Sequence, residues 1–350
     1  MSMDNVQDIY TLSPMQQGML FHTLYDPTSG AYSVQTIFTV KGALDTDAFR
    51  RTWGRIVERH PILRTAFVWE GVEEPLQVVY AEVDLPMAEH DLRWLSGEAQ
   101  EQQLNELLAA DRAQSFDLTE PPLMRFALIR LAEQEYRFVW SIHHILVDGW
   151  SLPLLMTEFQ AFYEAFRRGE DLYLPEPLPY GEYIGWLQEQ DLAEVEAFWR
   201  RNLAGFAAPT PLGITRGAGA PAGAPEEYTE QETELSRELT TRLQSLAQQH
   251  GLTLNTVLQA AWGLILSKYS GEDDVLFGAV VSGRSVPLPG VEAMVGPFIN
   301  TLPVRMTIDP AERLTDWWKR LQAQQFEARQ YEFSPLVQVQ SWSEVPRGTA

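Results

Sequence analysis

Apolar residues recur at helical spacing along several stretches of the chain. The clearest pattern follows Trp150, where apolar side chains stand at i, i+3, i+7, i+10 and i+14: Leu152, Leu155, Phe159, Phe162 and Phe166. This spacing predicts an amphipathic helix with one buried face. Comparable patterns predict helices over residues 14–24, 45–60, 96–113, 180–203, 236–250, 253–269 and 314–331. Ser13, Pro14 and Gln16 form a typical start for the first of these helices.

Other stretches are rich in β-branched residues and alternate loosely, which predicts strands. They cover residues 32–40, 63–69, 76–80, 123–131, 136–145, 228–235, 275–281 and 301–308. Because helices and strands alternate in both halves, we expect an α/β (α+β) sandwich in each half, a sheet covered by helices. The Pro-rich residues 169–179 predict a linker between the halves, and the Gly, Pro and Ala residues of 209–225 predict a mobile loop.

Composition narrows the classes of function. The 350 residues suggest two domains. Twenty-six Lys and Arg against 48 Asp and Glu leave a net charge of −22, which repels a phosphate backbone, so no nucleic-acid partner is expected. The absence of Cys excludes disulfides, thiolate metal sites and a Cys nucleophile. No apolar run reaches the ~18–20 residues of a membrane span, which predicts a cytoplasmic protein without a membrane partner.

The chemically distinctive segment is His143-His144-Ile145-Leu146-Val147-Asp148-Gly149, at the end of a predicted strand. Side chains alternate across a strand, so His143 and His144 should point to opposite faces and cannot share a metal ion. One imidazole would be structural and the other would line a cavity, with two structural histidines as the alternative. Gly149 would allow a turn with positive φ and close approach of a substrate. Asp148 could orient a histidine, cap a helix or join a buried ion pair.

This segment resembles the HHxxxDG signature of chloramphenicol-acetyltransferase-like acyltransferases. Five further segments resemble, in order, core motifs of the condensation domains of nonribosomal peptide synthetases. They are SPMQQGMLFH at 13–22, RHPILRTAF at 59–67, YGEYIGW at 180–186, VGPFINTLPVR at 295–305 and YEFSPLVQVQ at 331–340. Because the ordered motifs span nearly the whole chain, it is identified as a member of that family.

The resemblance implies two chloramphenicol-acetyltransferase-like lobes in a V-shaped pseudo-dimer with a channel between them. We expect an N-terminal lobe over 1–175, which carries HHxxxDG, and a C-terminal lobe over 176–350. Residues 346–350 resemble the beginning of the family's seventh motif, so the second lobe is expected to be truncated, with a less stable open sheet edge.

The implied reaction is peptide-bond formation in nonribosomal peptide biosynthesis. The amine of an acceptor aminoacyl thioester would attack a donor aminoacyl or peptidyl thioester. Both substrates would arrive on phosphopantetheine arms of donor and acceptor peptidyl carrier domains. A neighbouring adenylation domain in a larger synthetase is expected too, and no directly bound cofactor.

The resemblance also implies roles within the motif. His144 is expected to act as a general base or as a hydrogen-bond acceptor for the amine. The Gly149 amide, near a helix N-terminus, is expected to hydrogen-bond the substrate. His143 is expected to be structural, and Asp148 to face away from the substrate and pair with Arg284.

Four further residues are candidates for lining the channel: Arg64, Trp150, Ser151 and Asn300. Arg64 could instead pack lobe against lobe, Asn300 could fix the turn before its strand, and Trp150 could belong to the core. Three groups of arginines are candidate carrier-binding patches or simply solvated helix faces: Arg50, Arg51 and Arg55; Arg167 and Arg168; Arg200 and Arg201.

His143 separates the chain from heterocyclising members of the family, which carry Asp there. The first motif resembles that of domains accepting an L-configured donor. Two other functions fit the same residues. A free-standing acyltransferase would use a thioester donor with a soluble amine or alcohol, and a non-catalytic platform would only dock carriers or tailoring enzymes. The residues do not identify which amino acids are joined.

Overall fold

The computed structural model describes residues 5–27, 30–212 and 232–346. The chain forms two compact units. Unit 1 comprises Met1–Gln190 and Ser282–Ile299, and unit 2 comprises Asp191–Val281 and Asn300–Ala350. Unit 1 therefore includes a segment from late in the sequence, and each unit has its own buried core. The two units are defined by their internal contacts. The boundary between family lobes that the sequence predicts at 175/176 is a different division, and it stays a prediction.

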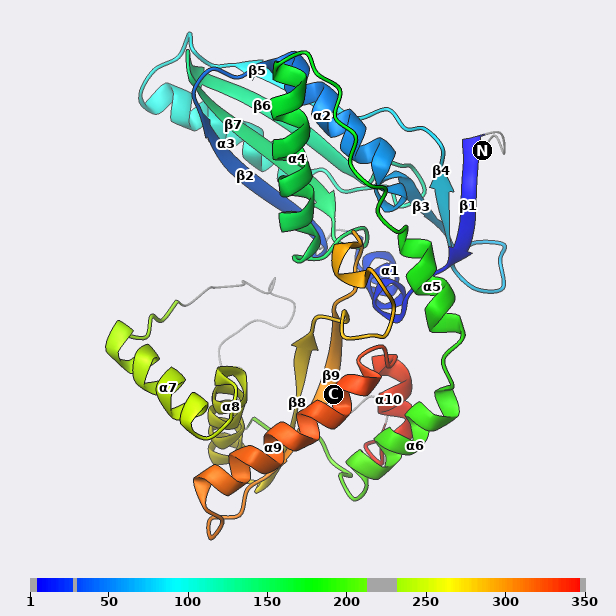
Figure 1. Cartoon of the computed structure of the whole chain (residues 1–350), viewed down its shortest axis with the longest axis vertical. Helices are drawn as coiled ribbons and strands as arrows, with labels where there is room; N and C mark the ends of the chain where they lie inside the picture. The colour runs from blue at the N-terminus through cyan, green and yellow to red at the C-terminus, as the bar shows by residue number, and fades with distance from the viewer. Residues whose placement is uncertain (1–4, 28–29, 213–231, 347–350) are drawn as a thin grey trace, which may run out of the picture. The chain divides into compact units, whose positions relative to one another are not determined.

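The main sheet of unit 1 has the strand order β2-β7-β6-β5 (Figure 1). Its strands are β2 (Ser33–Lys41), β5 (Met87–Asp91), β6 (Met124–Ala132) and β7 (Glu135–His143). β7 pairs antiparallel with both β2 and β6, whereas β5 runs parallel to β6. His143 stands opposite Ser33 of β2, and its N–H donates to the Leu123 carbonyl at 2.9 Å. The last residue of β7 is therefore held from both sides.

Helices cover both faces of this sheet (Figure 1). They are α2 (Thr46–Arg59), α3 (Glu98–Ala113) and α4 (Ser151–Arg167). The ring of Trp53 in α2 lies 4.6 Å from that of Phe126 and 5.0 Å from that of Trp140, centroid to centroid. Leu108 of α3 is buried with Val139 on the other face. Burying side chains of this size stabilises a fold by about 1.5–3 kcal/mol each.

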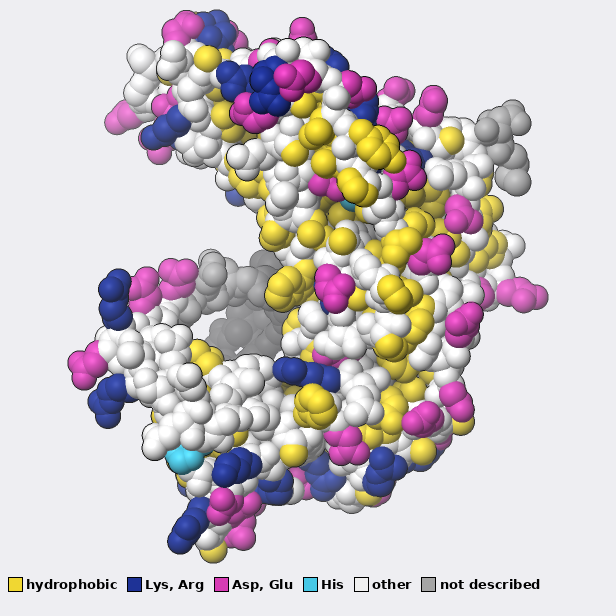
Figure 2. All heavy atoms as spheres, viewed as in Figure 1, with side chains coloured by type: hydrophobic (Ala, Val, Ile, Leu, Met, Phe, Trp, Pro, Cys, Tyr) yellow, Lys and Arg dark blue, Asp and Glu magenta, His cyan; other side chains and the backbone are white. Residues whose placement is uncertain are grey.

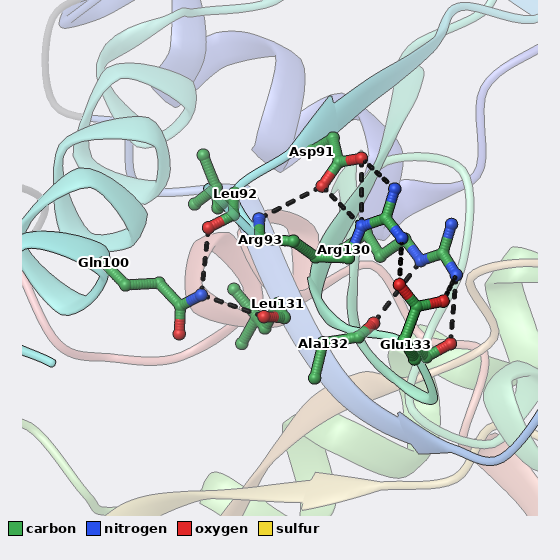
Figure 3. A network of polar contacts seen from close by, with 8 residues as sticks. All are labelled: Asp91, Leu92, Arg93, Gln100, Arg130, Leu131, Ala132 and Glu133. Atoms are coloured by element: carbon green, nitrogen blue, oxygen red, sulfur yellow. Dashed lines mark hydrogen bonds and ion pairs between the residues drawn. The ribbon is translucent and has the colours of Figure 1, made fainter. Parts of the chain in front are cut away.

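The edge strand β5 is held by a cluster of polar side chains (Figure 3). Arg93 donates to the Asp91 carboxylate over 2.6–3.1 Å and also bonds Glu133. Arg130 donates to Glu133 at 2.9 Å, and Gln100 of α3 donates to the carbonyls of Leu92 and Leu131 beside the charged group. The hydrogen bonds from Arg93 lower the pKa of Asp91 to about 2.

A second sheet of unit 1, in the order β1-β4-β3, supports the first helix. These elements are β1 (Val6–Thr11), α1 (Pro14–Tyr25), η2 (Pro61–Arg64), β3 (Thr65–Val68), β4 (Leu76–Tyr80) and α5 (Tyr180–Gln188). Ser13 and Gln16 form a capping box in which each side chain accepts the other's backbone N–H. Gln16 Nε2 also donates to the Ile145 carbonyl at 3.1 Å, which ties the start of α1 to the turn after β7.

Unit 2 contains an antiparallel pair of strands, β8 (Asp274–Val281) and β9 (Asn300–Thr307). Its helices are α6 (Leu192–Leu203), α7 (Arg237–Gln249), α8 (Leu254–Ser270), α9 (Leu314–Ala328), η4 (Arg329–Tyr331) and α10 (Leu336–Trp342). Apolar residues of α7, α8, α9 and both strands form one buried cluster. Within it, Trp317 Nε1 donates to the Thr307 carbonyl at 3.0 Å, which fixes α9 against β9.

The single helix predicted over 180–203 is wrong, because the structure has two helices, α5 and α6, separated at residues 189–191. The Asp191 side chain accepts the Ala193 N–H at 2.9 Å and so caps α6, and a cap of this kind begins a new helix. Strands β1 and β5 and helix α10 were not predicted, since their short sequences mix polar and apolar residues without a clear period.

Three expected features fall partly outside the described residues: the loop 209–225, the strand 228–235 and the seventh-motif segment 346–350. The described part of the expected strand, residues 232–235, is not a strand. Across the three described ranges, no helix is long and apolar enough to cross a membrane. The same ranges contain no group of three or more His, Asp or Glu side chains that could hold a metal ion.

Candidate functional site

The two histidines of HHxxxDG occupy different kinds of backbone. β7 ends at His143, and His144 begins a turn that runs to the start of α4. The expectation that the strand continues to Ile145 is therefore wrong. Because His144 lies outside the strand, the alternation of side chains along a strand does not predict the direction of its ring.

His143 is buried, with 3% of its surface exposed. Its Nδ1 accepts the Ile145 N–H at 3.2 Å, and its Nε2 lies 3.4 Å from Thr23 Oγ1. Since Nδ1 is an acceptor, the proton of the neutral ring belongs on Nε2. Burial, together with the neighbouring His144, lowers the pKa of His143 to about 4. His143 is therefore an uncharged part of the support at neutral pH.

His144 is half-buried and its main chain is anchored. Its N–H donates to the Tyr32 carbonyl at 2.7 Å, a short and well-formed hydrogen bond. Its Nδ1 is buried and has no hydrogen-bond partner among the residues that the structure describes. A ring nitrogen without a protein partner is available to hydrogen-bond a bound molecule.

Asp148 is the centre of the turn's hydrogen bonding. It is 2% exposed, and its carboxylate accepts hydrogen bonds from Ser151 N–H, Ser151 Oγ and Phe298 N–H, each at 3.0 Å. Arg284 Nη2 lies 3.3 Å from its Oδ1. The pair implied by the family resemblance is thus present, and it is buried on both sides.

Arg284 in turn holds the segment that comes from late in the sequence. Its Nη1 donates to the carbonyls of Val291 and Met294 at 2.7 and 2.8 Å, and its guanidinium lies 4.1 Å from the ring centroid of Phe298. One side chain therefore closes residues 284–298 into a loop and joins that loop to Asp148.

Ser151 belongs to the same cluster and is fully buried. Its Oγ accepts the Gly296 N–H at 3.1 Å and lies 3.0 Å from the Gly296 carbonyl. A Cβ at Gly296 would lie 2.2 Å from the Tyr180 ring, and the Tyr180 hydroxyl donates to the Pro297 carbonyl at 3.0 Å. Motif residues far apart in sequence are therefore packed without spare room behind the turn.

Gly149 and Trp150 lie on the exposed side of the turn. Gly149 does not have a positive φ, so the positive-φ turn that this glycine would allow is not formed. A Cβ at this position would meet nothing within 4 Å, and the Gly149 N–H has no acceptor among the described residues. Trp150 is 59% exposed, so its interpretation as a core residue is also wrong.

The other two channel candidates lie elsewhere. Arg64 is buried in unit 1 and donates to the carbonyls of Val57, Glu58, Tyr80 and Ala81 and to Gln7. These contacts all lie within one unit. Asn300 begins β9 of unit 2, and its side chain donates to the Glu332 and Ser334 carbonyls at 2.7 and 2.8 Å. Both arrangements favour a structural role over substrate contact.

Several supporting residues could not be found from sequence. The sequence predicts a channel position for Ser151, whereas the structure shows that it links Asp148 to Gly296. Tyr180 and Phe298 belong to two separate motifs, and the structure brings the centroids of their rings to 5.2 Å from each other. Their place in family motifs could have marked these residues as candidates for the site. The sequence alone does not show which motifs contact one another in the folded chain.

Most of the candidate carrier-binding arginines are paired with carboxylates of their own unit. The pairs are Arg50–Glu89, Arg55–Asp171, Arg167–Glu164, Arg168–Glu170, Arg200–Glu196 and Arg201–Glu327. Arg51 instead lies over the Phe166 ring at 4.3 Å. Figure 2 shows dark blue and magenta side chains interleaved at the top of the view. These arginines are thus compensated locally, which favours solvated helix faces.

Comparison with known proteins gives the family directly. The sequence model of the condensation domain matches residues 6–350. The chain belongs to the condensation-domain family. Condensation domains of nonribosomal peptide synthetases are acyltransferases that form amide bonds. This membership confirms the resemblance drawn from the six ordered motifs.

Curated relatives belong to peptide synthetases. The chain is 48% identical over 346 residues to one of the linear gramicidin synthase proteins of Brevibacillus parabrevis, covering 99% of this chain and 4% of that protein. It is 40% identical over 343 residues to bacitracin synthase 1 of Bacillus licheniformis, covering 98% of this chain and 6% of that protein. The chain thus spans a small fraction of the length of these relatives.

Solved structures show the same mixed α/β fold. A four-domain nonribosomal peptide synthetase in its holo form, bound to AMP and glycine, matches with a TM-score of 0.79 at 23% identity, over 98% of this chain and 25% of that one. The starter condensation domain of rhizomide synthetase matches with a TM-score of 0.77 at 20% identity, over 96% of this chain and 76% of that one.

Proposed function

We propose that this chain joins two thioester-bound substrates by a peptide bond. The observation that carries the proposal is the turn after β7. It presents the half-buried His144 ring, and a Gly149 N–H that has no acceptor in the described part of the chain, on a tightly fixed support. The acceptor amine would attack the donor carbonyl carbon, so that a C–N bond forms and the C–S bond breaks. The proton lost by the nitrogen would pass to the leaving thiolate.

His144 is the residue proposed to act on the amine. The amine must be uncharged to attack, and it loses a proton as the C–N bond forms. An imidazole nitrogen can take that proton as a general base or can accept a hydrogen bond that orients the amine. The hydrogen bond from the His144 N–H to the Tyr32 carbonyl fixes the main chain that carries the ring, which suits either role.

The Gly149 N–H is the group proposed to stabilise the developing negative charge on the carbonyl oxygen. It has no acceptor among the described residues, and the absence of a side chain leaves open space beside it. Gly149 precedes the N-terminal end of α4, where the helix dipole favours negative charge. His143, Asp148, Ser151 and Arg284 would act as positioning residues, because their contacts hold the turn.

The substrates are proposed to arrive on phosphopantetheine arms of a donor and an acceptor carrier domain. A neighbouring adenylation domain would load the acceptor carrier within a larger synthetase. Two acetyltransferase-like lobes over 1–175 and 176–350 are part of the same proposal. Support comes from family membership and from the synthetases that the chain resembles.

The test is a condensation assay with two loaded carriers, in which the dipeptidyl thioester is measured by mass spectrometry. We expect product with the wild-type chain and a loss of about 10²–10⁴-fold in rate for His144→Ala. His250→Ala, which removes an imidazole from the end of α7, is the matched control and should keep full rate.

Two outcomes would contradict the proposal: no product from the wild type with any carrier pair, or undiminished product from His144→Ala. Full rate with a soluble amine in place of the acceptor carrier would instead indicate a free-standing acyltransferase. Circular dichroism of each variant separates a catalytic loss from misfolding.

A further inference from the structure

One side of α9, near the start of α8, carries a stripe of three residues, Lys319, Phe326 and the adjoining Arg329 of η4. Unlike most arginines discussed above, its two cations are not paired with carboxylates among the described residues. A cavity of about 350 Å³ in unit 2 is lined by Thr253, Thr256, Lys319, Gln322, Ala323, Gln325, Phe326 and Arg329. Two of these residues are cations and none is acidic. In a chain with a net charge of −22, a cavity whose charged lining residues are all positive is unusual.

Neither cation is compensated within the described part of the chain. Lys319 and Arg329 have no carboxylate within ion-pair distance among those residues, in contrast to Arg320, which pairs with Glu312 at 2.8 Å. The carboxylates on the same helix are Asp316 and Glu327, and neither lines the cavity. Glu327 approaches Arg201 at 3.9 Å.

The lining residues of α9 and η4 share one face. Lys319, Gln322, Phe326 and Arg329 stand at i, i+3, i+7 and i+10, so the two cations are about 15 Å apart along the axis at 1.5 Å per residue. Between them lies Phe326, which is 68% exposed. The stripe therefore has the order cation, apolar centre, cation over about three helical turns.

The polar wall of the cavity is already rigid. Gln322 Oε1 accepts the Thr253 N–H at 2.8 Å and the Thr256 hydroxyl at 3.0 Å, and Gln322 Nε2 donates to the Gly251 carbonyl at 2.8 Å. Gln325 Nε2 donates to Gln259 at 2.6 Å. Because these amide groups already have hydrogen-bond partners within the chain, the groups left to contact another molecule are the two cations and the exposed Phe326 ring.

We propose that this stripe, Lys319–Phe326–Arg329, docks an acidic helical surface of a carrier domain. The proposal rests on the proposed function, in which carrier domains deliver both substrates. Phe326 would pack against the apolar side of the partner helix, and the flanking cations would meet carboxylates about two to three turns apart on that helix. A loaded carrier also carries the negative charge of its phosphodiester, which adds to the attraction.

The experiment measures carrier dependence with charge-reversed variants of the full chain. In the condensation assay, Lys319→Glu together with Arg329→Glu should raise the KM for one of the two carriers roughly tenfold and leave kcat near the wild-type value. Phe326→Ala should raise the same KM by a smaller factor. The wild-type KM should rise with salt, and the double variant should lose most of that dependence.

Arg242→Glu combined with Arg237→Glu is the matched control. It makes the same change in net charge on the exposed α7 of the same unit. A rise in KM equal to that of the stripe variant would show a general charge effect and would overturn the proposal. Unchanged KM values for both carriers in the stripe variant would overturn it too.

Small soluble thioesters separate this proposal from the proposed function. If the reaction is as proposed, the stripe variant keeps wild-type turnover of soluble aminoacyl thioesters, whereas His144→Ala loses it. If the wild type shows no turnover, binding of each holo-carrier is measured by fluorescence anisotropy. Weaker binding of one carrier to the stripe variant then supports docking, and equal binding, or no binding by the wild type, overturns it.

Discussion

Unit 1 contains two clusters in which an Asp carboxylate meets an Arg guanidinium. At the edge of the main sheet, Asp91 and Arg93 are two residues apart, 50% and 33% exposed, and joined at 2.6 Å (Figure 3). Behind the HHxxxDG turn, Asp148 and Arg284 are 136 residues apart, 0% and 8% exposed, and joined at 3.3 Å. The shorter contact belongs to the exposed pair.

The difference shows that distance alone does not measure what an ion pair does. Water can replace either partner of the exposed pair, and salt screens its attraction, so its net contribution is small. The buried pair has no such replacement. Its carboxylate also accepts the Ser151 and Phe298 N–H groups, so it connects the HHxxxDG turn to residues 284–298. The second cluster therefore contributes more to the stability of the turn than the first does to the sheet edge, because it is buried and bonds two separate segments, although its ion-pair distance is longer.

Asp148→Ala tests the buried cluster most strongly. The change removes the buried carboxylate that two backbone N–H groups and Arg284 Nη2 contact, whereas Arg284 Nη1 keeps its two carbonyl acceptors. We expect a loss of about 3–5 kcal/mol in the free energy of unfolding, measured by urea denaturation, together with loss of condensation. Asp91→Ala is the matched control and should shift the urea midpoint little. Equal midpoints for the two variants would refute the comparison.

His143 provides the next largest effect through pH. Its pKa of about 4 lies below the usual 6.5, so the folded state favours the neutral ring. The stabilisation is fully present above pH 6.5 and is lost as the pH falls toward 4, on the order of 3 kcal/mol in total. Urea unfolding between pH 7 and 4.5 should show a shallower decline for His143→Gln than for the wild type. Parallel curves would show that His143 titrates normally.

Gly296→Ala tests how closely the buried cluster is packed. A Cβ would stand 2.2 Å from the Tyr180 ring, so the ring or the segment must shift. We expect destabilisation by about 1–3 kcal/mol and reduced turnover. Gly185→Ala in α5 is the control, because a Cβ there meets nothing within 4 Å and helix propensity favours Ala. A Gly296→Ala protein as stable as Gly185→Ala would mean that the cluster has spare room.

Arg93→Gln should have the smallest effect. It removes the exposed ion pair but leaves β5 hydrogen-bonded to β6. At pH 7 we expect no measurable change in the urea midpoint and full condensation activity. Since the pKa of Asp91 is lowered to about 2, its stabilisation is present above about pH 4 and is lost as the pH falls through 2. A midpoint shift as large as that of Gly296→Ala would contradict this ranking.

Local sequence patterns predicted most elements of the fold. The helix after Trp150 and the capping-box helix at 14–24 correspond to α4 and α1, and the strand at 76–80 matches β4. Patterns failed where packing, not periodicity, decides the structure. β5 is a polar edge strand that exists because it pairs with β6, and the Asp191 cap divides a stretch that looks continuously helical.

The candidate site was predicted in its composition but not in its architecture. The HHxxxDG segment, and Arg284 as the partner of Asp148, came from family resemblance. That Trp150 is exposed, that Gly149 needs no positive φ and that Ser151 is a buried link came only from the structure. From its hydrophobicity, Trp150 would be expected in the core. It is accessible because it lies on the exposed side of the turn.

The sequence by itself determined the family, the alternation of helices and strands, and the residues available for chemistry. Each depends on local spacing or on the order of motifs along the chain. Only the tertiary structure decided that residues 284–298 close behind the turn at 148–151, and that Lys319 and Arg329 have no ion-pair partner among the described residues. The contacts behind the turn join residues more than 130 positions apart, so they depend on the packed volumes and buried charges of the whole unit.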